Sequence, residues 1–173
     1  MVRTGAGHIQ RSMRLVVLVT LLIVTAATFA HADSLSAGNA ALARGDYNNA
    51  AQQLLSLAER GQPRAQAMIG FMYATGQGVP QSYDAAAYWY RLAAEQGDTT
   101  AQYLLGLSYD KGQGVPLDEV AAYKWLNLAA AHAPKRMREN FARLRNALAS
   151  KMSRDQIAAG QWHALRWPVD SPF

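Results

Sequence analysis

Ser108 and Lys111 lie one helical turn apart in the stretch Ser108-Tyr109-Asp110-Lys111. This Ser-x-x-Lys spacing is used by β-lactam-recognising serine hydrolases, in which the serine hydroxyl attacks an acyl carbon and the lysine lies beside it. That chemistry also needs a second serine-containing motif and a Lys-Thr-Gly strand, and the sequence holds neither. A serine hydrolase using Ser108 and Lys111 therefore stays as an alternative, and no catalytic residue is predicted.

Metal and cofactor chemistry find little support. The chain has no cysteine, which excludes disulfides, thiolate metal sites and a cysteine nucleophile. His132 and His163 are 31 positions apart (163 − 132) without a paired acid nearby, unlike the two histidines of a helical zinc site. The Gly-x-Gly turns at 76–78 and 112–114 follow helical patterns rather than strands, so they are turn glycines. We expect no metal and no cofactor.

The elements that would position any site are set by an internal repeat. Residues 65–95 and 101–131 align at an offset of 36 (101 − 65), with 15 of 31 positions identical. In each copy, apolar residues recur at helical spacing on both sides of a Gly-x-Gly-Val-Pro turn. Gly76 is suited to end the first helix and Ser82 to cap the second, with Gly112 and Asp118 in the other copy. Each copy is therefore predicted to be a helical hairpin, and stacked hairpins make an all-α solenoid.

The repeat divides the chain as follows. Residues 33–62 are expected to be a degenerate N-terminal repeat with a tight Gly45-Asp46 turn, and residues 63–133 two full repeats. Residues 134–166 are expected to form two capping helices, the first with an apolar face of Met137, Phe141, Leu144 and Leu148, the second with Ile157, Trp162 and Leu165. Ser153 to Gln156 is predicted to form the capping box of that last helix. Residues 167–173 are predicted to be an irregular tail.

Residues 1–32 have the pattern of a signal peptide. Arg3, Arg11 and Arg14 precede an apolar run, and Ala30-His31-Ala32 offers the small-x-small pattern of a cleavage site before Asp33. No twin-arginine pair is present, so Sec-type export to the periplasm or outside the cell is expected. An uncleaved membrane anchor is the alternative.

The formal charge of +5 is unevenly distributed. Residues 33–132 carry 6 basic and 9 acidic side chains, a net of −3, whereas residues 133–173 carry 8 basic and 3 acidic ones, a net of +5. Because export is expected, nucleic acid is not expected as the partner of the basic part. The strip of Arg136, Arg138, Arg143 and Arg145 is interpreted first as a solvated helix face and second as a weak contact to an anionic surface.

The repeated residues resemble a known family. Ala-Gln-x-x-x-Gly-x-x-Tyr at 65–73 and 101–109, Gly-x-Gly-Val-Pro at 76–80 and 112–116, and Ala-Ala-x-x-Trp-x-x-Leu-Ala-Ala at 85–94 and 121–130 are similar to the Sel1-like repeat, a relative of the tetratricopeptide repeat. The resemblance implies a right-handed α-solenoid that acts as a non-catalytic adaptor for other proteins, often in envelope assembly or signalling.

The family register also implies which residues face the concave groove, and their spacing of three and then four positions supports one continuous stripe. These positions differ between the copies, whereas the packing positions agree. Phe71, Tyr103 and Leu107 are expected to anchor an apolar side chain of a peptide, with Asp110 and Lys111 at the rim. The full expected set is Arg64, Ala67, Phe71, Ala74 and Thr75 in one copy and Thr100, Tyr103, Leu107, Asp110 and Lys111 in the other.

The sequence thus predicts a periplasmic, non-catalytic scaffold that binds a protein or peptide segment in the solenoid groove. The two alternatives are the serine hydrolase and a module that associates with the envelope surface through the basic C-terminal helix.

Overall fold

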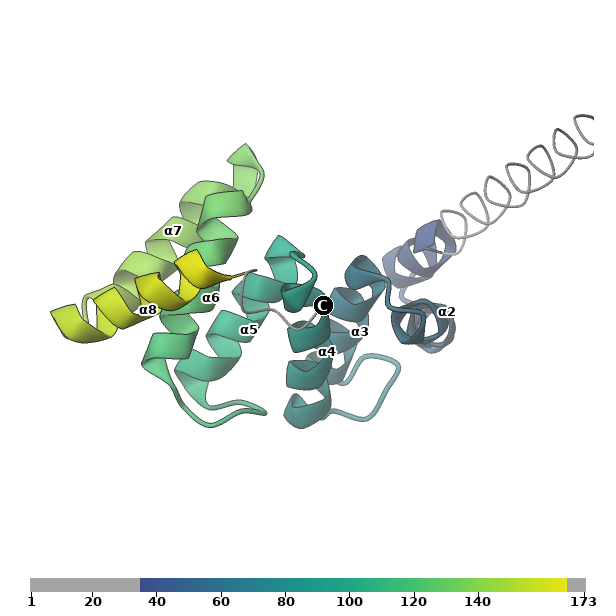
Figure 1. Cartoon of the computed structure of the whole chain (residues 1–173). Helices are drawn as coiled ribbons and strands as arrows, with labels where there is room; N and C mark the ends of the chain where they lie inside the picture. The colour runs from purple at the N-terminus through teal and green to yellow at the C-terminus, as the bar shows by residue number, and fades with distance from the viewer. Residues whose placement is uncertain (1–34, 168–173) are drawn as a thin grey trace, which may run out of the picture.

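The computed structural model describes residues 35–167, and this part of the chain is helical without a strand. The predicted signal segment and residues 168–173 of the predicted tail lie outside the described residues. After a helix that includes residues 35–43, the order is α2 (Tyr47–Glu59), α3 (Pro63–Thr75), α4 (Tyr83–Glu95), α5 (Thr99–Lys111), α6 (Glu119–His132), α7 (Lys135–Ala149) and α8 (Arg154–Arg166). The helical hairpins stack side by side along the chain (Figure 1), so the predicted all-α solenoid is confirmed.

The helices begin and end where the local signals place them. The backbone N–H of Ala85 donates to the side chain of Ser82 at the start of α4, and that of Ala121 donates to Asp118 at the start of α6. Gly76 and Gly112 end α3 and α5 in the left-handed conformation, which glycine adopts without a steric penalty.

The same glycine contact holds each hairpin together. A Cβ built on Gly70 would lie 2.7 Å from the ring of Tyr90, and one built on Gly106 would lie 2.8 Å from Leu126. Tyr90 and Leu126 are equivalent residues, 36 positions apart (126 − 90). The missing Cβ lets a large side chain of the second helix lie on the backbone of the first. Gly38 has the same relation to Leu54, so the N-terminal hairpin packs in the same way with a shorter turn.

Neighbouring hairpins are joined by aromatic side chains. Tyr73 packs against both the core around Leu54 and Ile69 and the core around Tyr90 and Leu105. Tyr109 likewise contacts the central core and the one around Leu126. These tyrosines fill the space between successive hairpins.

The stacked hairpins are also seated on one another through their turns. A Cβ on Gly78 would overlap the carbonyl oxygen of Tyr47, and a Cβ on Gly114 would overlap that of Tyr83. Both glycines have positive φ, 71° and 70°, and Tyr47 and Tyr83 are each the first residue of a second helix. Each Gly-x-Gly turn therefore rests on the preceding hairpin.

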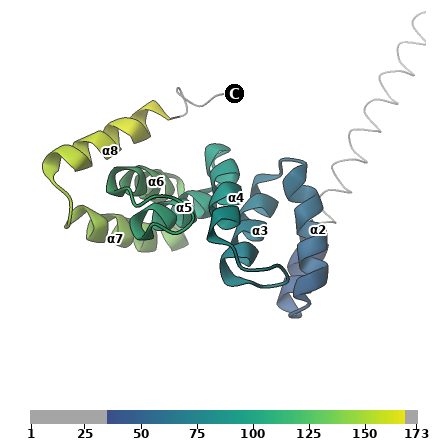
Figure 2. The same ribbon diagram turned by 90° about the horizontal axis from the view of Figure 1, so that it is seen from below.

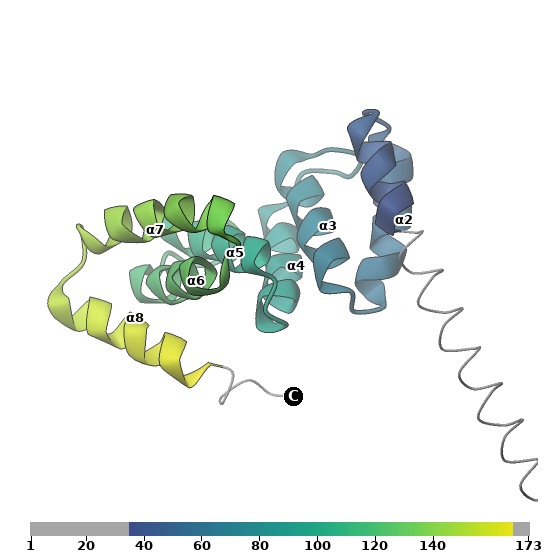
Figure 3. The ribbon, with the colours of Figure 1, turned by 90° about the horizontal axis from the view of Figure 1, so that it is seen from above.

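The C-terminal helices form the end of the array. Both α7 and α8 pack against α6, and they diverge on either side of it in Figures 2 and 3. The expected capping box is present, because Gln156 N–H donates to Ser153 Oγ and Ser153 N–H donates to Gln156 Oε1.

The apolar face predicted for α8 is wrong in part. Trp162 and Leu165 are 57% and 81% exposed, whereas Gly160 and Ala164 are buried. A Cβ on Gly160 would lie 2.8 Å from the ring of Tyr123, so α8 approaches α6 through its small residues. Small side chains, rather than the bulky ones, select the face that packs.

Among residues 35–167 no helix combines the length and the apolar character that a bilayer crossing requires.

Candidate functional site

The first helices of the two full repeats enclose a shallow apolar surface, which we call the α3–α5 groove. It consists of two adjoining hollows of about 190 and 150 Å³ that share Phe71 and Leu104 as lining residues. Phe71 is 47% exposed, a large value for an aromatic ring without a polar atom. The first hollow is lined by Leu42, Arg64, Ala67, Met68, Phe71, Thr100 and Leu104, and the second by Phe71, Ala74, Tyr83, Ala86, Tyr90, Leu104, Leu107, Ser108, Lys111 and Gln113.

Equivalent ends of α3 and α5 lie next to each other across the groove. Arg64 Nη1 donates to Thr100 Oγ1 at 3.3 Å, and these residues are 36 positions apart (100 − 64). The two helices therefore run in the same direction in register, with residues of one repeat opposite the same positions of the next.

The structure brings together seven of the ten residues expected in the groove. Phe71 lines both hollows, and the other six each line one, namely Arg64, Ala67, Ala74, Thr100, Leu107 and Lys111. Ala67 is itself nearly covered, with 3% of its surface exposed, so it forms part of the floor. Whether these residues hold a ligand stays a prediction.

Three expected residues lie elsewhere. Thr75 is exposed and its hydroxyl donates to the carbonyl of Phe71, and Asp110 is half-buried at the side of α5 without lining either hollow. Tyr103 stacks on Phe141 of α7, with ring centroids 4.5 Å apart and planes 14° from parallel. This burial raises the pKa of the Tyr103 phenol. The ring expected to anchor a peptide is therefore covered by the C-terminal cap.

Eight lining residues were not expected in the groove from the sequence: Leu42, Met68, Tyr83, Ala86, Tyr90, Leu104, Ser108 and Gln113. Leu104 separates the hollows, and it stands at the same repeat position as Met68, which lines the first hollow. The shared large apolar character at this position is the signal in the sequence that could have indicated both residues. Tyr83 comes from the start of α4, outside the first helices to which the expectation was confined.

Ser108 and Lys111 both line the second hollow, but the serine is engaged. Its side chain is 8% exposed and its hydroxyl donates to the carbonyl of Leu104 at 3.1 Å. Within residues 35–167 no hydrogen bond joins Ser108 to Lys111. The serine hydroxyl is thus directed at its own helix backbone rather than at a base, which is a structural arrangement common for serine within helices.

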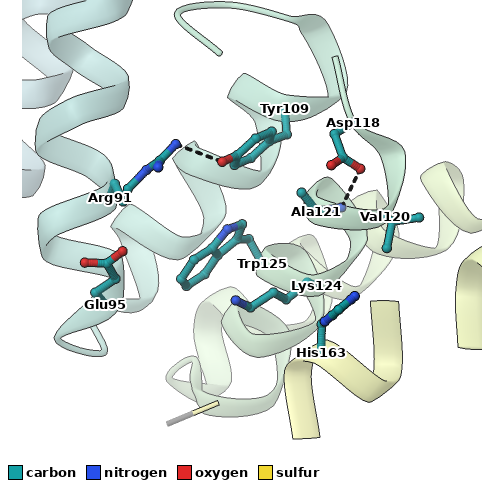
Figure 4. A pocket seen from close by; sticks show the side chains of 9 residues that line it. All are labelled: Arg91, Glu95, Tyr109, Asp118, Val120, Ala121, Lys124, Trp125 and His163. Carbon is teal, nitrogen blue, oxygen red and sulfur yellow. Dashed lines mark hydrogen bonds between the residues drawn. The ribbon is translucent and has the colours of Figure 1, made fainter. Parts of the chain in front are cut away.

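A second concavity, the polar cleft, lies between α4, α5, α6 and α8 (Figure 4) and has a volume of about 300 Å³. Arg91 Nη2 donates to the hydroxyl of Tyr109 at 2.9 Å, and Lys124 Nζ lies 4.4 Å from the ring centroid of Trp125. Glu95 and His163 complete its polar lining together with Asp118, which caps α6. The sequence did not reveal this cleft, because α8 closes it from a distant part of the chain.

The basic strip on α7 is mostly exposed, as expected of a solvated helix face, and three of its arginines make hydrogen bonds within the chain. Arg138 donates to the carbonyl of Ala133, Arg143 donates to Asn140, and Arg145 donates to Asn127 of α6 at 3.1 Å. Arg136 is exposed. These bonds agree with a strip that stabilises the cap, and a contact to an anionic surface stays a prediction.

No cluster of three or more His, Asp or Glu side chains suited to a metal ion occurs in the described part of the chain. His132 is exposed at the end of α6, where its Nδ1 lies 3.0 Å from the carbonyl of Leu128, and His163 is exposed at the edge of the polar cleft.

Two segments of the chain match the model of a known repeat family. Residues 63–98 and 99–133 each match the Sel1 repeat model. The fold is similar to the crystal structure of c5321, a protective antigen present in uropathogenic Escherichia coli strains that displays an SLR fold: 26% identity, a TM-score of 0.72, and coverage of 79% of this chain and 29% of that one. A Sel1 repeat protein from Oxalobacter formigenes shares 38% identity with a TM-score of 0.55, over 57% of this chain and 39% of that one.

No curated protein matches the sequence. The chain spans 29% and 39% of the two similar structures, so the likeness concerns the repeats and not the whole of either protein. Residues 63–133 of the chain therefore consist of two adjacent Sel1 repeats, stacked in the fold of these structures.

Proposed function

We propose that this protein is an exported, non-catalytic adaptor of the cell envelope that binds a peptide segment of a partner protein in the α3–α5 groove. The Sel1 repeat fold is typically a protein–protein interaction scaffold and its family is generally non-catalytic. The signal-peptide pattern of residues 1–32 supports export to the periplasm.

The exposure of Phe71 between two apolar hollows carries the proposal. A large apolar side chain at the centre of a concave surface is the kind of residue that supplies most binding energy in protein interfaces. Stacking does not demand this side chain. The equivalent residue in the next repeat is Leu107, and the close packing contact is made by the adjacent glycine, Gly70 or Gly106.

Variation between the copies supports the same surface. The packing residues Gly70 and Tyr73 are identical to Gly106 and Tyr109, whereas Arg64, Phe71 and Thr75 are replaced by Thr100, Leu107 and Lys111. The groove can therefore change its chemistry while the solenoid keeps its geometry, which is how repeat proteins obtain different partners on one scaffold.

Site-specific photo-cross-linking in the producing cell tests the proposal. A photoreactive phenylalanine in place of Phe71 is expected to give a discrete protein adduct. Tyr88 is the matched control position, because it is also an exposed aromatic residue, 58% exposed, and lies on α4 outside the groove. Equal adducts from both positions, or none from Phe71, would contradict binding in the groove.

Export is tested separately on the same material. The mature protein is expected to start at Asp33 and to be released with the periplasmic fraction, which N-terminal sequencing and intact mass measure. Retention of residues 1–32 with the membrane fraction would instead favour the anchor.

A further inference from the structure

We propose that the α3–α5 groove selects a short extended peptide whose apolar side chains are flanked by two acidic residues about five or six positions apart. This inference rests on the proposed function and names the chemistry of the segment that the groove takes.

The charge of the groove is of one sign. Arg64 lines the first hollow and Lys111 the second, and these are the charged residues among the described lining of both. No acidic side chain lines either hollow within residues 35–167. An acidic partner therefore meets attraction at both ends of the groove without a compensating repulsion, and complementary charge fixes which partner binds and in which register.

The fold does not require these cations. Arg64 corresponds to Thr100 and Lys111 corresponds to Thr75, so each position carries an uncharged threonine in the other repeat. Both threonines stand in well-formed helices, α3 and α5. The positive charges are thus properties of this surface and not of the stacking.

The helix geometry sets the spacing between the two charges. Arg64 is the second residue of α3 and Lys111 the last of α5, and the Arg64–Thr100 bond places the N-terminal ends of both helices together. From the level of Thr100 to Lys111 there are 11 residues (111 − 100), which is about 16 Å along a helix at 1.5 Å per residue. Because α3 and α5 are not packed closely along their length, we take a lateral offset of about 10 Å, and the charges lie roughly 19 Å apart. An extended chain covers that distance in about five or six residues.

The middle of the groove accepts apolar side chains. Phe71 and Leu104 lie between the hollows, with Leu107 beside them in the second. A segment with an acidic residue at each end and two apolar side chains between them satisfies the charges and both hollows at once.

Fluorescence anisotropy with four labelled synthetic peptides tests the proposal on the mature protein. The first has two aspartates five positions apart with one leucine and one phenylalanine between them. The second has lysine and the third serine in place of both aspartates, and the fourth has the aspartates eleven positions apart in a helix-forming sequence. The first peptide is expected to bind about tenfold more tightly than the lysine peptide at low salt, and the difference is expected to shrink as salt is added.

Charge reversal locates the interaction. Lys111→Glu and Arg64→Glu are each expected to weaken the aspartate peptide about fivefold while leaving the serine peptide nearly unchanged. Lys151→Glu is the matched control, because Lys151 is an exposed cation in the turn between α7 and α8, far from the groove in sequence and on another element. A Lys151→Glu effect as large as that of Lys111→Glu would overturn the assignment.

The outcomes separate this inference from the function on which it rests. If the serine peptide binds as tightly as the aspartate peptide, and Phe71→Ala weakens both, the groove binds peptides but the acidic selectivity is wrong. If the helical peptide binds best, the extended conformation is wrong. If no peptide binds and the Phe71 cross-link is also absent, the groove function itself fails.

Discussion

The side-chain amide of Gln96 donates a 2.8 Å hydrogen bond to the side-chain oxygen of Gln66. Gln66 is buried, and its own amide donates to the carbonyl of Ala58 in the preceding hairpin at 3.1 Å. One buried glutamine thus links three helices, and both of its polar atoms have partners.

The next repeat breaks this pattern, which leads to a first prediction. Gln102 is 0% exposed and donates to Ala94, but its side-chain oxygen has no partner because His132 replaces the donor at the position of Gln96. His132→Gln is expected to raise the free energy of unfolding by about 1 kcal/mol, and Gln96→Ala to lower it by about 1–3 kcal/mol. Urea unfolding measures both, with the exposed His163→Gln as control; a destabilised His132→Gln protein would contradict the reasoning.

The close contact between Gly114 and the Tyr83 carbonyl gives a second prediction. Gly114→Ala combines an unfavourable positive φ with an overlap against the Tyr83 carbonyl, so we expect a loss of about 3 kcal/mol or more in unfolding free energy. Gly45→Ala isolates the backbone term, because Gly45 has a φ of 75° with no atom within 4 Å of an added Cβ, and should cost only about 1–2 kcal/mol. Equal losses for the two variants would show that the turn does not rest on the preceding hairpin.

Tyr90 predicts how stability depends on alkaline pH. Burial raises the pKa of its phenol above the ordinary value of about 10. The unfolded chain therefore loses this proton first, and the stabilisation that is complete below pH 10 declines as the pH rises, by about 1.4 kcal/mol per pH unit. Tyr90→Phe should remove this part of the slope in urea unfolding measured above about pH 10.

Tyr103 and Leu107 are expected to separate stability from binding. Tyr103→Ala deletes the stacking on Phe141 and should lower the unfolding free energy by about 1–3 kcal/mol, because the cap loses its contact with α5. Leu107→Ala should cost less stability but weaken the aspartate peptide about fivefold or more. Thermal unfolding and anisotropy on each single variant measure the two effects; the reverse pattern would return Tyr103 to the groove.

Ser108→Ala tests the alternative chemistry. Since the Ser108 hydroxyl donates to the Leu104 carbonyl, the variant is expected to bind the aspartate peptide within about twofold of the unmodified protein. In a chromogenic β-lactam assay, we expect no turnover from either protein above the uncatalysed rate. Turnover that disappears in Ser108→Ala would establish the hydrolase instead.

The fold could be predicted because its signals are local and occur twice. Gly76 ends one helix and Ser82 caps the start of the next, and Gly112 and Asp118 do the same in the second repeat. Tyr90 could not be predicted as the partner of Gly70, because its equivalent is Leu126 and identity between the copies does not mark this position.

The candidate site was predicted only in part, for a physical reason. A repeat register assumes that each copy has the same neighbours. The first full repeat, however, lies between the N-terminal hairpin and the second full repeat, whereas the second lies between the first full repeat and the C-terminal cap. The register therefore placed Phe71 and Leu107 on the groove, whereas Phe141 covers Tyr103. The polar cleft depends on α8 returning to α6, a long-range contact that no spacing within the repeats encodes.

The turn glycines also explain where the array stops. The residue 36 positions after Gly114 is Ser150 (114 + 36), and its φ of −65° is that of a right-handed helix. Without a left-handed turn there, α7 runs on to Ala149 and α8 departs in another direction. The array could therefore be lengthened only before that serine. A further 36-residue repeat inserted after residue 98 would contact a repeat hairpin on each side, so the C-terminal helices would not have to change.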